Sequence, residues 1–210
     1  MLAIPPRYAG WLTSKGTQVE IYAHIDESGG RLPSGRRLYG IAAVLTEQSH
    51  HAALRQRLRE LLMPNEDHLH FYDESPKRRL EISERLADLP FTGALLVTDE
   101  TTNTEQERMR RRLLGWLLPR LQHTEAVNHA VVESRSGGDK HDRRTRDHLI
   151  KSRQVTSDMR VTHVLKHHDE LLWLADFVAS SYTTAVLHDQ PEPWLTLNAA
   201  HAIDVITDPG

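Results

Sequence analysis

The sequence predicts an α/β fold in which helices flank a mixed β-sheet. Two segments with the alternating, β-branched composition of strands come first, and segments with helical spacing then alternate with further strand-like segments. The 210 residues suffice for one domain. We place this domain at residues 1–210, with a core at about 19–187 and a C-terminal tail at 188–210.

The first strand is expected at residues 19–25, where apolar and polar side chains alternate. A loop at 27–37 with glycines and a proline leads to a second strand at 38–45, so we expect a hairpin with a wide turn. A helix follows at 49–62, because its leucines fall on one face and Ser49 can cap it.

A short third strand is expected at residues 68–72. Ser75, with Pro76 at the first helical position, caps the next helix. The apolar run at 92–98 is bounded by turn residues and predicts a fourth strand, and the leucine-rich segment 104–121 predicts a helix.

A fifth strand at residues 126–133 ends in an acid and precedes a polar, basic helix at 139–151. The sixth strand, at 161–165, is followed by a strongly apolar helix at 170–187. Right-handed crossovers would place the first, fourth and fifth strands parallel and adjacent. We expect Trp194 to pack the C-terminal tail against the rest.

The composition excludes several classes of site. The absence of cysteine excludes disulfides, thiolate zinc sites and a cysteine nucleophile. A formal net charge of -3 gives no overall nucleic-acid signature. No stretch has the length and apolarity of a signal peptide or a membrane span, so we expect a cytoplasmic protein. The sequence also lacks a glycine-rich phosphate-binding loop, the nucleophile elbow of serine hydrolases and the paired-histidine zinc motif.

Three acids stand where metal ligands are expected. Asp26 follows the first strand, Glu133 ends the fifth, and Asp176 lies in the apolar helix, within ELLWLADFVAS. Carboxylates at the carboxyl ends of parallel strands converge at one sheet edge, and a buried carboxylate needs a cation or another partner. Their repulsion favours Mg²⁺ or Mn²⁺, which binds oxygen donors and activates water against phosphodiesters.

Each acid also has a purely structural interpretation. Asp26 can form an Asx-turn, Glu133 can pair with Arg135, and Asp176 can bond to an arginine. Acids that end strands are common, so spacing alone leaves both interpretations open.

The segments that carry these acids resemble the DUF3800 family of bacterial proteins. IDESG follows the N-terminal strand, VVESR follows a later strand, and LLWLADFVAS lies near the C-terminus. The resemblance implies a ribonuclease H-like sheet with an acidic site formed by Asp26, Glu133 and Asp176. Within HLHFYDE it also places His70 where family members often carry a histidine. Trp173 departs from this pattern, since many members have glutamine there, and so does KHHDE, where a serine-containing stretch is usual.

Competing candidates lie near these acids. Asp99, at the end of the fourth strand, is an alternative to Glu133 as the second metal acid, or it belongs to a helix N-cap region. His68 and His70 alternate on the predicted strand and would bind zinc with a third histidine, or they are edge-strand polar groups. His70 is also a candidate proton carrier or phosphate contact.

Two basic clusters are candidates for nucleic-acid contacts. In the helix at 139–151, Lys140, Arg143 and Arg144 would hold a phosphate backbone, or they form a solvated helix face. The arginines at 108 and 110–112 form a second cluster with the same two interpretations. Asp139 and Asp142, just past Glu133, are a further candidate ligand pair, or they pair with the local arginines in solvent. No aromatic side chains interleave with the basic ones in support of base stacking.

The sequence therefore predicts a nuclease that uses Mg²⁺ or Mn²⁺ on Asp26, Glu133 and Asp176, with His70 as a further catalytic residue. The expected partner is nucleic acid, either DNA or RNA. The alternatives are a catalytically inactive nucleic-acid-binding or regulatory protein, and a protein-interaction module on the same fold. The oligomeric state does not follow from the sequence.

Overall fold

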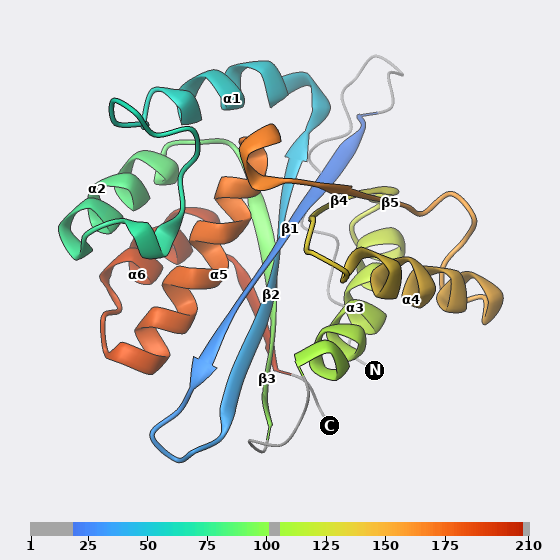
Figure 1. Ribbon diagram of the computed structural model, residues 1–210. Helices are drawn as coiled ribbons and strands as arrows, with labels where there is room; N and C mark the ends of the chain where they lie inside the picture. Colours follow the sequence, from blue (N-terminus) through green and yellow to red (C-terminus); the bar gives the residue numbers. More distant parts are fainter. Residues whose placement is uncertain (1–18, 101–105, 208–210) are drawn as a thin grey trace.

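A computed structural model describes residues 19–100 and 106–207 (Figure 1). The strands are β1 (Ile21–Arg31), β2 (Arg37–Glu47), β3 (Thr92–Glu100), β4 (His129–Glu133), β5 (Arg160–Val164) and β6 (Asp204–Thr207). The helices are α1 (His51–Arg59), α2 (Pro76–Ala87), α3 (Gln106–His123), α4 (Asp139–Lys151), α5 (Leu171–His188) and α6 (Glu192–His201).

The described strands form one six-stranded sheet in the order β5-β4-β1-β2-β3-β6. β1, β2 and β3 pair antiparallel, whereas β4 pairs parallel with β1, β5 with β4, and β6 with β3. The predicted fold class, an α/β fold with a mixed sheet flanked by helices, is confirmed in this architecture. One detail is wrong: β3 does not lie beside β1, because the two antiparallel connections place β2 between them.

The helices cover both faces of the sheet (Figure 1). One apolar core joins the sheet to α1, α2, α5 and α6, and a second joins its other face to α3 and α4. Side chains of successive strand residues point to opposite faces, so Asp26 faces α5 whereas Glu27 faces α3. The two adjacent acids Asp26 and Glu27, which lie inside β1, therefore belong to different layers.

The first hairpin is longer than predicted. β1 continues to Arg31, through the first five residues of the expected loop at 27–37. Gly29 is a strand residue, and a Cβ atom there would lie 2.6 Å from the carbonyl oxygen of Leu38 on β2. This glycine allows close strand approach rather than a turn, so the loop prediction is wrong.

Two further local predictions are wrong and one is confirmed. Residues 68–72 form no strand: the N–H of Phe71 donates to Asp176 rather than to a neighbouring strand, and a 3₁₀ turn follows. Ser49 caps no helix, since its hydroxyl donates to Glu47. Ser75 does cap α2, because its side chain accepts from the N–H of Arg78.

The C-terminal segment belongs to the same layers. Trp194, on α6, packs edge-on against Tyr182 with ring centroids 5.1 Å apart, as predicted for the tail. β6 then extends the sheet beyond β3. The predicted helix at 139–151 matches α4 at both ends, whereas residues 104 and 105 of the predicted helix at 104–121 lie outside the described part. None of the described helices is long and apolar enough to cross a membrane.

Candidate active site

Three carboxylates from different elements meet at one edge of the sheet. Asp26 lies on β1, Glu133 ends β4, and Asp176 lies in the second turn of α5. β1 and β4 are parallel neighbours, and their pairing of Ile25 with Val132 places the following residues, Asp26 in the middle of β1 and Glu133 at the end of β4, beside each other. Asp26 and Asp176 are each 2% exposed, whereas the side chain of Glu133 is 27% exposed.

The ammonium group of Lys166 lies where these carboxylates meet. Its Nζ is 2.9 Å from Asp26 Oδ2, 3.2 Å from Asp176 Oδ1 and 3.5 Å from Glu133 Oε1. Lys166 opens the short turn η3 (Lys166–His168) that joins β5 to α5. The sequence alone did not identify this lysine as a member of the site.

Neighbouring groups fix the two buried carboxylates. The N–H of Phe71 donates to Asp176 Oδ2 at 2.8 Å, and Ser180 Oγ donates to Asp176 Oδ1 at 3.3 Å. The N–H of Glu27 donates to Asp26 Oδ1 at 2.7 Å. Both carboxylates are therefore held in place before any ligand binds.

Burial sets the ionisation of the cluster. Burial raises the pKa of Asp26 well above its usual value; the charge of Lys166 opposes this rise and Glu133 adds to it. Burial likewise raises the pKa of Asp176 against the effect of Lys166. Burial alone would lower the pKa of Lys166, but attraction to the three carboxylates outweighs it and raises that pKa. One ammonium does not neutralise three carboxylates, so the cluster can accept more positive charge.

A pocket of about 560 Å³ gives access to the cluster. Its lining includes Glu133, Lys166 and Asp176, and also the predicted histidines His68 and His70. His70 is thus near the acids, and its charge contributes to lowering the pKa of Asp176, against the dominant effect of burial. The structure places His70 in the lining of this pocket, and its role as a proton carrier or phosphate contact stays a prediction.

The three carboxylates are oxygen donors of the kind that bind a hard divalent cation. The ammonium group of Lys166, however, already lies between them. Within residues 19–100 and 106–207, no three His, Asp or Glu side chains are arranged to hold a metal, for zinc or any other ion. Carboxylate oxygens are the ligands that Mg²⁺ and Mn²⁺ prefer. In this structure the Lys166 ammonium lies where the three acids meet, so a metal ion would have to compete with it for the same oxygens.

Asp99 is not part of this cluster. β2 separates its strand from β1, and its side chain is 45% exposed and pairs with Arg36 at 3.0 Å. The alternative in which Asp99 replaces Glu133 is therefore wrong.

The second arginine cluster is divided between two environments. Arg110 is 1% exposed and donates to both carboxylate oxygens of Asp142, through Nε at 3.0 Å and Nη2 at 2.8 Å. It also pairs with Glu27. Burial alone would raise the pKa of Asp142, but hydrogen bonds with His163 and Arg110, with the charges of Arg110 and Arg135, hold it far below its usual range. Arg110 and Asp142 are therefore structural.

The spacing of residues along the predicted helix indicates the buried position of Arg110. Arg110 precedes Leu113, Leu114 and Leu117 at the intervals of one helix face, the face that α3 buries in the core. Lys166 had no comparable signal, because it lies in a short turn without periodicity.

The basic residues predicted on α4 lie at the surface. Lys140, Arg143 and Arg144 are all exposed. Only Arg144 lines the larger pocket, which lies between α3 and α4 and is separate from the acidic one.

No family model matches the chain, and no curated protein matches it. Among solved structures, it is similar to a ribonuclease HII of Archaeoglobus fulgidus in complex with PCNA, at 18% identity and a TM-score of 0.48, over 87% of this chain and 82% of that one. It is also similar to a mutant of Bst-RNase HIII, at 14% identity and a TM-score of 0.44, over 86% of this chain and 52% of that one.

Proposed function

We propose that this chain is a divalent-metal-dependent nuclease that hydrolyses phosphodiester bonds at the acidic cluster. The observation that carries the proposal is the convergence of Asp26, Glu133 and Asp176 on one point, with two of them buried. Three repelling carboxylates held in this way cost folding free energy, which a bound cation would recover. The motifs that resemble DUF3800 support the same proposal, and on them we propose that the chain is a member of that family.

In this proposal, Asp26, Glu133 and Asp176 would hold Mg²⁺ or Mn²⁺. When bound, the ion supplies positive charge for the phosphoryl oxygens and lowers the pKa of water. The Phe71 N–H and Ser180 orient the Asp176 carboxylate. The ammonium of Lys166 can turn towards the pocket, whose lining it already shares, and contact a substrate phosphate.

The test is cleavage of labelled DNA and RNA, single- and double-stranded, in Mn²⁺ and in Mg²⁺. We expect the parent to cut at least one substrate and Asp176→Asn to cut none. Asp99→Asn is the matched control, because it removes an exposed acid outside the cluster, and it should cut like the parent. If Asp176→Asn cuts as fast as the parent, the proposal is wrong.

A second candidate function is that of a nucleic-acid-binding protein without catalytic activity. Lys166 favours it, because a built-in ammonium satisfies part of the charge of the cluster without a metal. Titration calorimetry with Mn²⁺ separates the two. Metal binding by the parent that Asp176→Asn lacks, together with cleavage, supports the nuclease; no metal binding and no cleavage, with nucleic acid still bound, supports the second candidate.

A further inference from the structure

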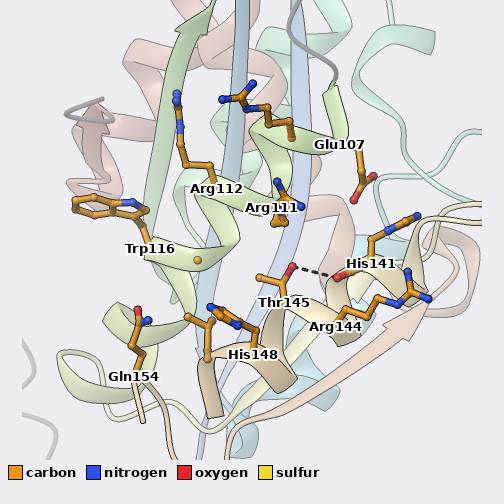
Figure 2. Close-up of a pocket in the computed structure, with 12 residues that line it drawn as sticks. Glu107, Arg111, Arg112, Trp116, His141, Arg144, Thr145, His148 and Gln154 are labelled. Atoms are coloured by element: carbon orange, nitrogen blue, oxygen red, sulfur yellow. Dashed lines mark hydrogen bonds between the residues drawn. The ribbon is translucent and has the colours of Figure 1, made fainter. Parts of the chain in front are cut away.

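The larger pocket lies between two helices that are far apart in the sequence. It has a volume of about 900 Å³ and is lined by side chains of α3 and α4 and by Gln154, which follows α4 (Figure 2). Its basic lining consists of Arg108, Arg111, Arg112, His141, Arg144 and His148. The two basic clusters of the sequence thus contribute to one surface, which we call the α3–α4 groove.

Three arginines of the α3–α4 groove have no acidic partner among the residues that the structure describes. Arg108, Arg111 and Arg144 are exposed, and no acid in the described part of the chain pairs with any of them. The one acid in the lining, Glu107, is 3.3 Å from Arg135, which lies outside the groove lining. An anionic ligand would therefore meet several available guanidinium groups.

An indole ring lies in the same groove. Trp116 is 52% exposed although α3 buries most of its other large apolar side chains. In Figure 2 it lies on one side of the pocket and Arg144 on the other. Gly115 also lines the groove, and a Cβ atom there would meet no atom within 4 Å, so the space beside the indole is open. This arrangement places an aromatic ring among the basic side chains, which the sequence did not indicate.

We propose that the α3–α4 groove binds single-stranded nucleic acid, with phosphates on Arg108, Arg111 and Arg144 and a base stacked on Trp116. Guanidinium groups bind phosphate oxygens, and an exposed ring stacks on any unpaired base. In a duplex the bases already stack on one another, so Trp116 favours a single strand. An acidic peptide would satisfy the arginines but not the indole.

The groove and the acidic pocket are close to each other along α3. Gln106 lines the acidic pocket and the next residue, Glu107, lines the groove. Arg135 connects the two, since it pairs with Glu107 and also with Glu27, which lines the acidic pocket. A strand bound in the groove can continue towards the acids, and in this respect alone the inference rests on the proposed nuclease function.

The binding test uses the whole chain in EDTA, so that no metal-dependent cleavage occurs. A thymidylate oligonucleotide of about 16 nucleotides should bind and quench tryptophan emission. Trp116→Leu should abolish that quenching and weaken binding roughly 5- to 100-fold, whereas Trp116→Phe should restore most of the affinity. Equal binding by Trp116→Leu and the parent would overturn the inference.

Charge is tested with a matched pair of exposed arginines on α4. Arg144→Gln should weaken binding and reduce the salt dependence by about 0.7 in the logarithmic slope, the value for one lost single-strand phosphate contact. Arg143→Gln removes the same charge from the same helix outside the groove lining and should have the smaller effect. Equal losses for both would mean nonspecific attraction, which overturns the inference.

Further probes distinguish the occupants and the two proposals. Polyglutamate, a duplex and an abasic strand should each bind more weakly and quench less than the oligonucleotide; polyglutamate binding as tightly would point to an acidic protein partner and overturn the inference. Asp176→Asn should bind the oligonucleotide like the parent. If the parent binds the oligonucleotide but cuts no substrate, the nuclease alone is refuted. If the parent cuts nucleic acid but the groove variants bind as tightly as the parent, the groove alone is refuted.

Discussion

The indole N–H of Trp173 donates a hydrogen bond of 3.0 Å to the backbone carbonyl of Lys166. Trp173 is 1% exposed and lies one turn before Asp176 on α5. The same helix therefore positions both the carboxylate and the turn that carries the ammonium. The two places where the sequence departs from the DUF3800 pattern, Trp173 and the KHHDE segment, are in direct contact.

Replacing Trp173 with Phe tests this relationship. The change leaves the Lys166 carbonyl without its buried donor, so we expect a loss of about 1–3 kcal/mol in the free energy of unfolding. Urea unfolding measures it. Trp116→Phe is the control, since that ring is exposed, and it should change stability by less than about 0.5 kcal/mol. A Trp173→Phe protein as stable as the control would mean that the bond does not hold the turn.

Removing the ammonium tests how the cluster is balanced. Lys166→Met leaves three carboxylates without their cation, so we expect a loss of about 3–5 kcal/mol at pH 7 in EDTA. Added Mn²⁺ should raise the melting temperature of this variant more than that of the parent, because metal and ammonium compete. Lys77→Met, at a side chain 88% exposed, should be neutral in both measurements. If Mn²⁺ stabilises the parent more than Lys166→Met, then Lys166 does not compete with the metal.

Removing one carboxylate should have the opposite effect. Burial raises the pKa of Asp26 above its unfolded value of about 3.9, so this group favours folding at low pH and loses that contribution as pH rises towards the folded-state pKa. We therefore expect Asp26→Asn to be more stable than the parent at pH 7 in EDTA, by on the order of 1 kcal/mol. The difference should shrink towards pH 4, where the parent carboxyl binds its proton. A variant that is less stable at pH 7 would show that attraction to Lys166 exceeds repulsion.

The three acids of the cluster could be predicted from the sequence because each of them follows or interrupts a recognisable apolar strand or helix segment. Asp26 and Glu133 follow apolar strand segments, and Asp176 interrupts an apolar helix, so their location depends on local patterns that the fold preserves. The strand at 68–72 was mispredicted because its N–H groups have long-range partners. Phe71 donates to Asp176, 105 positions away, and no local pattern reports such a contact.

The residues that sequence reasoning missed act through tertiary contacts between distant segments. Lys166 joins the cluster because η3 brings it to Asp26 in the middle of β1 and to Glu133 at the end of β4. Trp116 lies in the leucine-rich segment that predicts a helix, and only the folded chain shows that its ring is exposed in the same groove as Arg144. When a side chain contacts a residue of another helix or strand, sequence periodicity indicates the face of its own element on which it lies. It does not indicate which residue it contacts.

The divided arginine cluster leads to a paired stability prediction. Arg110→Met leaves Asp142 and Glu27 without their buried partner, so we expect a loss of about 3–5 kcal/mol. Arg111→Met changes an exposed neighbour and should stay within about 0.5 kcal/mol of the parent. Urea unfolding of both variants measures the difference. Equal effects would contradict the buried ion-pair network.

The buried network around Asp142 also predicts that the free energy of unfolding falls in acid. Its hydrogen bonds and charges hold the folded-state pKa of Asp142 below the unfolded value of about 3.9. The group therefore contributes stability that is fully present above about pH 4 and is lost as pH falls further. Parent and Asp142→Asn should differ most at pH 7 and converge in strong acid. A difference that grows below pH 4 would reverse the assigned sign.

Two glycine-to-alanine substitutions separate the effect of helix propensity on stability from the effect of backbone strain. Gly115 lies inside α3, and neither it nor Gly137 would bring a Cβ atom within 4 Å of another atom. Ala is favoured over Gly inside helices, so Gly115→Ala should gain about 0.5–1 kcal/mol in unfolding free energy. The gain falls at the lower end if Pro119, which cannot donate to the Gly115 carbonyl, already bends the helix there.

Gly137 is the matched control because its φ is +72°, a conformation that disfavours alanine. Gly137→Ala should lose about 1–2 kcal/mol, the opposite sign for the same added methyl group. Urea unfolding gives both values, and oligonucleotide binding by Gly115→Ala completes the test. Because the added Cβ enters the α3–α4 groove beside Trp116, this variant should be more stable than the parent yet bind more weakly. A variant that gains stability and binds as tightly would show that the open space at Gly115 does not serve the ligand.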